Sequence, residues 1–287
     1  MGNQVAIGES DVGHLDNEKL PDELLGRKLY GNDYNIEQLA NWYRDEENGY
    51  FNLTNDEHLF YGEYVYDQKA GTPFHARHLP KQEFPVCVAL GCARGDDVVS
   101  LNRKIGRIIA IEPTKDWWRN DIFGIPAEYR SPNIGGEIDL PDNSVDLVVA
   151  FGCLHHVANV EFVISECARI LKPGGWLAIR EPIISMGDFR KDRVGLTKRE
   201  RGIPEHLMQD FITKSGMDVV HRSYCSFNPF ISIFHKMGIW VPFNYRIVTI
   251  IDWMLSELTS FNARYWRPKI WQKFAPSSAA FLAQRQP

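Results

Sequence analysis

Short apolar runs alternate with segments of helical periodicity through the middle of the chain. Short apolar runs are typical of strands buried on both faces of a parallel sheet, and they fall at residues 86–90, 107–111, 145–151 and 176–180. Residues 218–222 are predicted as a further strand. The intervening segments favour helices that begin near residue 97, cover residues 160–172 before Pro173, and cover residues 204–215. This alternation predicts a doubly wound α/β sheet.

Another helix is predicted upstream of this region. Apolar side chains recur at positions 36, 39, 40 and 43, which is the spacing of one helical face. Asn35 and Gln38 are placed as a capping box, and Gly49 provides a stop. Neither a repeat nor a low-complexity linker separates this flank from the middle. We therefore expect the flanks to be built onto the sheet.

Composition narrows the class of protein. With 44% hydrophobic and 24% charged residues in 287, the chain is typical of a globular protein rather than a disordered or coiled-coil one. The net charge of −5 offers no general basic surface, so we expect no nucleic-acid partner. Of the aromatic residues (16 Phe, 11 Tyr and 8 Trp), only nine lie between residues 85 and 223. The others are concentrated in the flanks.

Cysteine usage favours a reducing compartment. The five cysteines are scattered without metal-ligand spacing, and their odd number argues against a disulfide framework. We therefore expect no metal site and a cytoplasmic location. The first ten residues lack the pattern of a secretory signal. The most apolar stretch, residues 229–255, is interrupted by charges and Pro242, so it does not predict a spanning helix.

A glycine-containing turn follows the first predicted strand. Gly91 and Gly95 bracket Cys92, Ala93 and Arg94, and such a turn lets backbone N–H groups approach a ligand closely. About 20 residues further on, Glu112 follows the second strand, where an acidic side chain can accept both hydrogen bonds of a ribose diol. The pair indicates an adenosine-containing ligand, either a dinucleotide or S-adenosylmethionine.

Three motifs further along the chain distinguish between a dinucleotide and S-adenosylmethionine. Residues 140–149 (LPDNSVDLVV), 151–156 (FGCLHH) and 171–177 (LKPGGWL) closely resemble the class I S-adenosylmethionine-dependent methyltransferases, and more narrowly the type 11 methyltransferase domains. The resemblance covers about residues 85–223. It implies a Rossmann-like, mostly parallel seven-stranded sheet whose last strand is antiparallel, which we expect at residues 279–283, and S-adenosylmethionine as the cofactor.

The resemblance also implies cofactor-binding residues. Gly91 and Gly95 match the loop around the methionine part, Glu112 the acid on the ribose, and Glu137 lies near an adenine-contacting acid. Phe151 and Gly152 match the strand end that borders cofactor and acceptor. Ala93 and Arg94 replace the usual small residues, and Ala89 replaces the usual acid. As a hypothesis, Arg94 binds the cofactor carboxylate, and Asp96 or Asp97 binds its ammonium group.

Three side chains are candidates for removing a proton from the acceptor. His155 and His156 follow the strand at 145–151, and Glu181 ends the strand at 176–180. These positions lie on the ligand side of such a sheet, and histidine is suited to base chemistry near neutral pH. The alternative is that one histidine caps the next helix and the other packs beneath the insertion.

The chain divides into four predicted parts. Residues 1–84 form an N-terminal helical and aromatic extension that caps the substrate, residues 85–223 the cofactor-binding core, residues 224–277 a helical aromatic insertion, and residues 278–287 the final strand. The insertion has three alternative roles: a lid over the acceptor, which we favour, a membrane-facing surface, or a dimer interface. The basic runs at 190–193 and 198–201 are either a solvated face or a phosphate contact.

These observations predict methyl transfer from S-adenosylmethionine to a small-molecule or glycan-type acceptor, at oxygen. Two alternatives are methylation of a lipid-linked substrate at a membrane surface, and a noncatalytic domain that keeps the fold for binding or scaffolding. A nicotinamide dehydrogenase is disfavoured because the chain lacks Gly-x-Gly-x-x-Gly at the turn. The possible partners besides the acceptor are a membrane surface, in peripheral contact, and a second copy of the chain in a homodimer.

Overall fold

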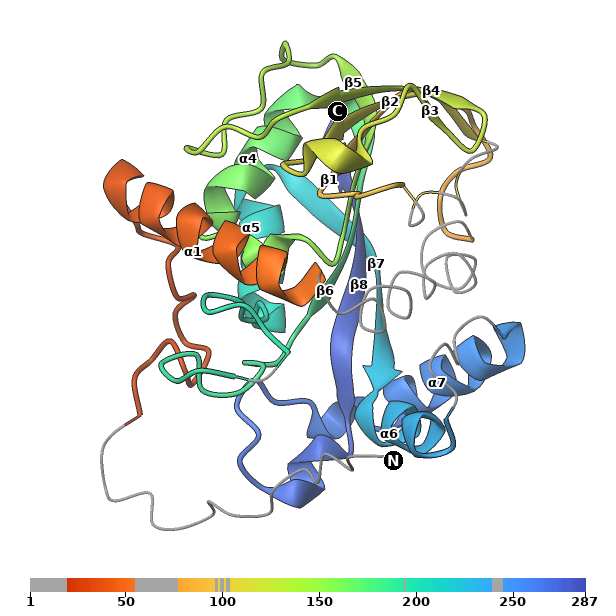
Figure 1. Cartoon of the computed structure of the whole chain (residues 1–287). Coiled ribbons are helices and arrows are strands. Elements are labelled where there is room, and N and C mark those ends of the chain that lie inside the picture. Colours follow the sequence, from red (N-terminus) through yellow and green to blue (C-terminus); the bar gives the residue numbers. More distant parts are fainter. Residues whose placement is uncertain are drawn as a thin grey trace.

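The computed structural model describes residues 20–54, 77–95, 98, 101, 104–193, 195–238 and 245–287. An eight-stranded sheet runs through it in the order β3-β4-β2-β1-β5-β6-β8-β7 (Figure 1). The strands are β1 Phe84–Leu90, β2 Ile105–Ile111, β3 Asp121–Ile122, β4 Ile125–Arg130, β5 Val145–Phe151, β6 Leu171–Pro182, β7 Met217–Phe227 and β8 Pro276–Arg285.

The strand directions confirm a doubly wound, mostly parallel α/β sheet. Strands β4, β2, β1, β5 and β6 pair in parallel, whereas β8 is antiparallel to both of its neighbours, β6 and β7. The expected antiparallel last strand at 279–283 lies within β8. The sheet has eight strands rather than seven because the short β3 pairs with β4 in a hairpin.

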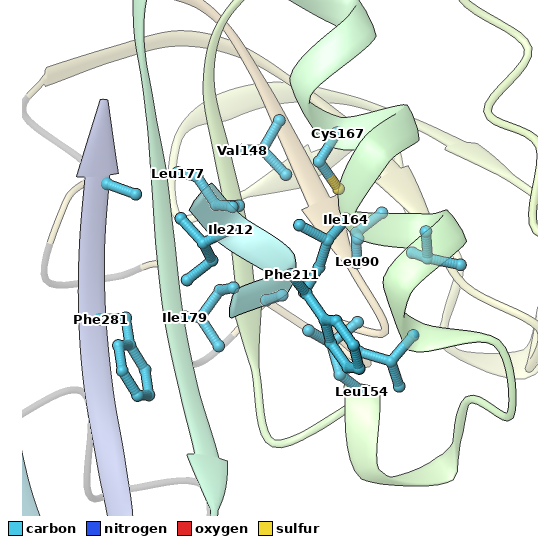
Figure 2. Close-up of a cluster of buried hydrophobic side chains, with 14 of the residues drawn as sticks. Leu90, Val148, Leu154, Ile164, Cys167, Leu177, Ile179, Phe211, Ile212 and Phe281 are labelled. Carbon is cyan, nitrogen blue, oxygen red and sulfur yellow. The ribbon is translucent and has the colours of Figure 1, made fainter. Parts of the chain in front are cut away.

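Two helices cover one face of the sheet. These are α4 Val160–Ile170 and α5 Glu205–Lys214. Figure 2 shows how Ile164 and Cys167 of α4 and Phe211 of α5 pack against Val148 and Leu177 of the strands. Helix α4 ends earlier than expected, because Leu171 begins β6 and Lys172 pairs with Asp146 (Nζ–Oδ1 2.6 Å).

A second apolar layer lies on the opposite face of the sheet. It includes Ala89, Val149 and Ala178 from the strands, together with Val98 and Leu101. The helix expected to begin at residue 97 falls mostly outside the described residues. Because strand side chains alternate between the two faces, apolar side chains cover both faces of the sheet.

Helix α1, Ile36–Thr54, packs through Leu39 and Trp42 against Ala158, in the segment that precedes α4. The predicted capping box is present: the Asn35 N–H donates to Gln38 Oε1 at 2.9 Å, and the Gln38 N–H donates to Asn35 Oδ1 at 3.0 Å. The expected stop at Gly49 is wrong, because the helix continues to Thr54.

Two more helices occupy the stretch between β7 and β8, at the end of β7 (Figure 1). They are α6 Asn228–Lys236 and α7 Arg246–Leu258. Val248 of α7 packs with Cys225 of β7 and Ala280 of β8, and Phe230, Phe234 and Trp253 surround them. Short 3-10 turns complete the described elements: η3 Lys115–Trp117, η4 Leu154–His156, η6 Ser260–Asn262 and η7 Ile270–Lys273. No described helix is long and apolar enough to cross a membrane.

Candidate active site

The turn after β1 requires glycine at both of its ends. Gly91 has φ +53°, and a Cβ there would lie 2.5 Å from the Cβ of Cys153. Gly95 has φ +84°, and a Cβ there would lie 2.5 Å from Cγ2 of Ile122. Both positions therefore combine a left-handed backbone with close packing that no larger residue fits. Packing against Cys153 and Ile122 therefore fixes the path of the turn at the carboxyl end of β1.

Glu112 lies at the end of β2 and touches this turn. Its Oε2 accepts the Ala93 N–H and its Oε1 accepts the Thr114 N–H, both at 2.9 Å. Burial raises the pKa of Glu112, and these two amide donors partly oppose that shift. The Tyr129 hydroxyl donates to the Ala93 carbonyl at 2.9 Å. The structure thus brings the predicted turn and the predicted acidic residue together, with the carboxylate holding the turn in place.

The other residues implied by the resemblance differ in exposure. Phe151 is buried at the end of β5, and the Gly152 N–H donates to the Arg180 carbonyl at 2.7 Å. Arg94 and Glu137 are exposed, and Glu137 belongs to the loop between β4 and β5. Asp96 and Asp97 lie outside the described residues.

Ala89 lies fully buried in the apolar layer of β1. A carboxylate at this position would have to be buried among apolar side chains, at a cost of several kcal/mol unless a partner compensated it. The local packing therefore accounts for the missing acid.

His155 follows β5 and is held between two carboxylates. Its Nδ1 lies 2.7 Å from Glu181 Oε2, and its Nε2 lies 3.5 Å from Glu200 Oε1. Glu181 is fully buried, and it also accepts the N–H groups of Cys153 and Leu154 at 2.8 and 2.7 Å. Glu181 therefore fixes both the ring of His155 and the backbone that carries it.

The two carboxylates favour the charged form of His155. Burial by itself lowers the pKa of His155, but Glu181 and Glu200 outweigh burial and raise it to about 10. Burial acts against the charged form of Glu200 too, yet the two histidines and the Thr197 N–H lower its pKa to about 2. The base role of His155 and Glu181 stays a prediction. The surroundings of both groups argue against it, since the carboxylates raise the pKa of His155 and Glu181 already accepts two backbone N–H groups.

His156 contacts helix α1 rather than the sheet. Its Nδ1 lies 2.7 Å from Oε2 of Glu46, which is buried. The Thr197 hydroxyl donates to the same oxygen at 2.7 Å, and the Arg199 N–H donates to Glu46 Oε1 at 3.0 Å. Glu46 therefore links α1, η4 and the stretch around residue 198.

Two further buried side chains hold α1 over the end of β5. The Trp42 Nε1–H donates to the His156 carbonyl at 2.7 Å. The Arg201 guanidinium, also fully buried, donates to the carbonyls of His155, Val157 and Ala158 at 3.1, 2.9 and 3.0 Å. It also lies 5.1 Å from the centroid of the Trp42 ring.

Sequence reasoning missed four residues of this network: Trp42, Glu46, Glu200 and Arg201. Glu46 lies 110 residues from His156, and Arg201 lies 46 residues from His155. No local spacing signals such contacts. The second basic run is therefore partly a set of internal cations: Arg201 is buried, and Arg199 pairs with Asp45 at 2.8 Å.

The strand order, the antiparallel β8, the glycine turn after β1 and the acid after β2 define a class I, Rossmann-like methyltransferase fold. Within this fold, residues 88–179 match the sequence model of the family described as "Methyltransferase domain". The chain thus contains a class I S-adenosylmethionine-dependent methyltransferase domain of the type 11 group, and S-adenosylmethionine is the cofactor of this class.

Curated relatives are similar to parts of the chain. A ubiquinone biosynthesis O-methyltransferase of Rhizobium johnstonii is 23% identical over 117 residues, which are 37% of this chain and 47% of that protein. A "probable S-adenosylmethionine-dependent methyltransferase" of Mycolicibacterium smegmatis is 44% identical over 96 residues, 32% of this chain and 36% of that protein. The chain thus spans about half, or less, of the length of these two relatives.

Solved structures share the fold. The complex of the Trm112 methyltransferase activator with a protein described as a methyltransferase, from Haloferax volcanii, contains a chain that superposes with a TM-score of 0.51. The identity is 14%, and the match covers 88% of this chain and 97% of that chain. At this identity the likeness concerns the fold alone.

Proposed function

We propose that this protein transfers the methyl group of S-adenosylmethionine to a small-molecule acceptor, at oxygen. The observation that carries the proposal is the contact between the glycine turn and Glu112 inside a class I methyltransferase fold. The relatives named as ubiquinone biosynthesis O-methyltransferases support the choice of a small molecule and of oxygen. A glycan-type acceptor fits the same chemistry.

The residues of the turn fit the cofactor. Gly91 and Gly95 give the turn its left-handed backbone and let it pack against Cys153 and Ile122 at the end of β1. Glu112 places a carboxylate beside the turn, where this class of fold binds the ribose of its cofactor. Bound S-adenosylmethionine supplies the reactive methyl group and its own leaving group. The task left to the protein is to hold an acceptor in line with that methyl group, which can contribute several kcal/mol.

Proton removal from the acceptor remains to be assigned. Each predicted histidine uses Nδ1 to contact a buried carboxylate, so a base would have to act through Nε2. Turnover of His155→Ala and His156→Ala at saturating cofactor tests this role directly. Full turnover in both variants would remove both histidines as bases.

Cofactor binding is tested by thermal denaturation with S-adenosylhomocysteine and with NAD. A ligand that binds only the folded state at 100 times its Kd adds about 2.7 kcal/mol of stability. We expect the melting temperature to rise with S-adenosylhomocysteine and not with NAD. No rise at millimolar S-adenosylhomocysteine would refute the proposal, and a rise with NAD alone would favour a dehydrogenase.

If the protein binds S-adenosylhomocysteine but methylates no acceptor, it would be a noncatalytic binding or scaffolding domain. An untargeted search for mass gains of one methyl group, in extracts given protein and isotope-labelled S-adenosylmethionine, separates the two. A labelled product identifies the acceptor class, and its absence across polar and lipid extracts would favour a binding or scaffolding role.

A second candidate function is methylation of a lipid-linked acceptor at a membrane surface. Helix α7 exposes the stripe Ile247, Ile251, Met254 and Leu258, which are 64%, 39%, 58% and 72% exposed. Their spacing places them along one face of the helix, opposite the side that packs on β7 and β8. Such a stripe is typical of a helix that lies in a membrane interface.

Further exposed apolar and cationic side chains follow α7 along the chain. Phe261, Ile270, Trp271 and Phe274 are exposed, and the Arg264 guanidinium lies 5.6 Å from the Trp271 ring centroid. Exposed cations at positions 246, 264, 269 and 273 accompany these apolar groups, so their charge is complementary to anionic lipid headgroups.

Cosedimentation with phosphatidylcholine vesicles, with and without phosphatidylglycerol, tests the membrane contact. We expect binding to the anionic vesicles, reduced at least tenfold in the double variant Ile247→Ser/Met254→Ser. Phe123→Ser, at a residue exposed in the β3–β4 hairpin, is the matched control. Absence of binding to either kind of vesicle would refute this candidate function. If the parent is a dimer and the double variant a monomer, the stripe is instead an interface between two copies of the chain.

A further inference from the structure

Three ligand-bearing side chains meet at the carboxyl end of β5. One ring nitrogen each of His155 and His156 and one carboxylate oxygen of Glu200 all lie within 4.8 Å of one another. His155 and Glu200 are buried, and His156 is half-buried. We propose that these three residues bind a divalent transition-metal ion of the zinc class.

The surroundings of the cluster are those of a metal site. Histidines that bind metals usually direct their other ring nitrogen to a carboxylate, which fixes the ring. Here both histidines do so: His155 Nδ1 lies 2.7 Å from Glu181 and His156 Nδ1 lies 2.7 Å from Glu46. The Thr197 N–H donates to Glu200 Oε2 at 3.0 Å, while Oε1 is the oxygen nearest His155. All three candidate ligands are therefore oriented by a second partner.

The distances suit a shared ion. His155 Nε2 and Glu200 Oε1 are 3.5 Å apart, which is long for a hydrogen bond. Two ligand atoms about 2.1 Å from a tetrahedral zinc ion lie about 3.4 Å from each other. The separation of this pair therefore already matches that of two zinc ligands, and the His156 nitrogen lies within 4.8 Å of both atoms.

The charged groups around the cluster also favour a divalent metal ion. Glu46, Glu181 and Glu200 place three buried carboxylates around the two imidazole rings. The cations that face them are Arg201, which donates to backbone carbonyls, and Arg193, which donates to the Met186 and Thr197 carbonyls. When His155 binds as a neutral ligand, the three carboxylates face these two arginines, and a divalent ion offsets the remaining negative charge.

Two histidines and one carboxylate leave a coordination position open, as in zinc sites that also hold water or substrate. The site joins η4, which follows β5, to the stretch at residue 200, and Glu46 of α1 supports it. The ion would therefore tie α1 to the end of the sheet and offer its open position to water or to an acceptor oxygen. When the ion binds, a proton held by His155 leaves to solvent.

Metal content tests this proposal without any use of activity. The full chain is stripped with chelator, incubated with Zn²⁺ or Co²⁺ and desalted, and bound metal is measured by inductively coupled plasma mass spectrometry. We expect about one equivalent in the parent, and ligand-field absorption of bound Co²⁺ in the visible region. His156→Gln and Glu200→Gln should lose the metal, whereas Glu46→Gln should weaken binding about 10- to 100-fold.

His206→Ala is the matched control, because His206 is an exposed histidine of α5 outside the cluster. It should keep the full equivalent. Less than a tenth of an equivalent in the parent would overturn the proposal, and so would unchanged binding in Glu200→Gln. If the variants fail to fold, the parent remains decisive, since a Co²⁺ spectrum without ligand-field bands would show that the cluster is an ion-paired network only.

Discussion

Replacing Trp42 by alanine should loosen the N-terminal helix from the rest of the protein. The Trp42 side chain is fully buried, and its Nε1–H is bonded to the His156 carbonyl at 2.7 Å. It packs with Leu39 and Ala158, beneath Tyr30 and Tyr34. The variant therefore removes the largest apolar contact between α1 and the loop after β5.

The expected loss follows from area and from the hydrogen bond. A tryptophan buries roughly 200 Å², which corresponds to at most about 5 kcal/mol at about 25 cal/mol per Å². Measured changes of buried tryptophan to alanine cost about 3–5 kcal/mol. Trp42→Phe keeps most of the apolar area and leaves the His156 carbonyl without this donor, so it should cost about 1–3 kcal/mol.

Urea denaturation gives the free energy of unfolding, and hydrogen exchange of α1 separates local detachment from global unfolding. We expect Trp42→Ala to lose at least 3 kcal/mol globally or to lose protection selectively in residues 36–47. Phe123→Ala, at a residue that is 49% exposed, should change stability by less than about 0.5 kcal/mol. A loss below about 1 kcal/mol with full protection of α1 would refute the assigned packing.

Gly95→Ala should weaken S-adenosylhomocysteine binding at least tenfold in calorimetry, whereas Gly124→Ala, with the same φ of +84° but no neighbour within 4 Å of its Cβ, should not. Asp252→Ala should cost about 3 kcal/mol in urea denaturation, because two amide N–H groups at the end of β7 lose their acceptor at 2.8 Å. Arg169 lowers the pKa of Glu166 below its ordinary 4.5, so the pair stabilises the fold above that pH and the contribution is lost on acidification. In Glu166→Gln, the free energy of unfolding measured in urea should therefore fall less steeply as the pH is lowered below about 4.5.

The strands were predicted where apolar residues run without interruption. Residues 86–90 and 145–151 are such runs, and they form most of β1 and all of β5. Strand β4 has the sequence IPAEYR, in which Pro126 and Glu128 are exposed, and this mixed pattern reads as a turn. The capping box was readable because both of its bonds connect residues three apart.

Only part of the candidate site could be predicted from the sequence, because local patterns do not reveal contacts between distant segments. The glycine turn and Glu112 follow consecutive strands, so topology brings them together. Glu46 and Glu200 reach the histidines through packing of α1 and of the stretch near residue 198, and no periodicity marks such contacts. The exposed stripe of α7 was visible as an apolar segment, but its outward direction depends on which face meets β7.

The family match covers only one part of the site. The family match ends at residue 179, before Glu181 and Arg201, and it begins after α1 with Trp42 and Glu46. These four residues hold the loop that follows β5, and the acceptor must bind beyond that strand end. We therefore expect the matched residues to bind the cofactor, and acceptor choice to depend on contacts between segments outside residues 88–179. Variants of the residues around η4 should thus change acceptor KM more than cofactor affinity, and equal changes in both would place acceptor recognition elsewhere.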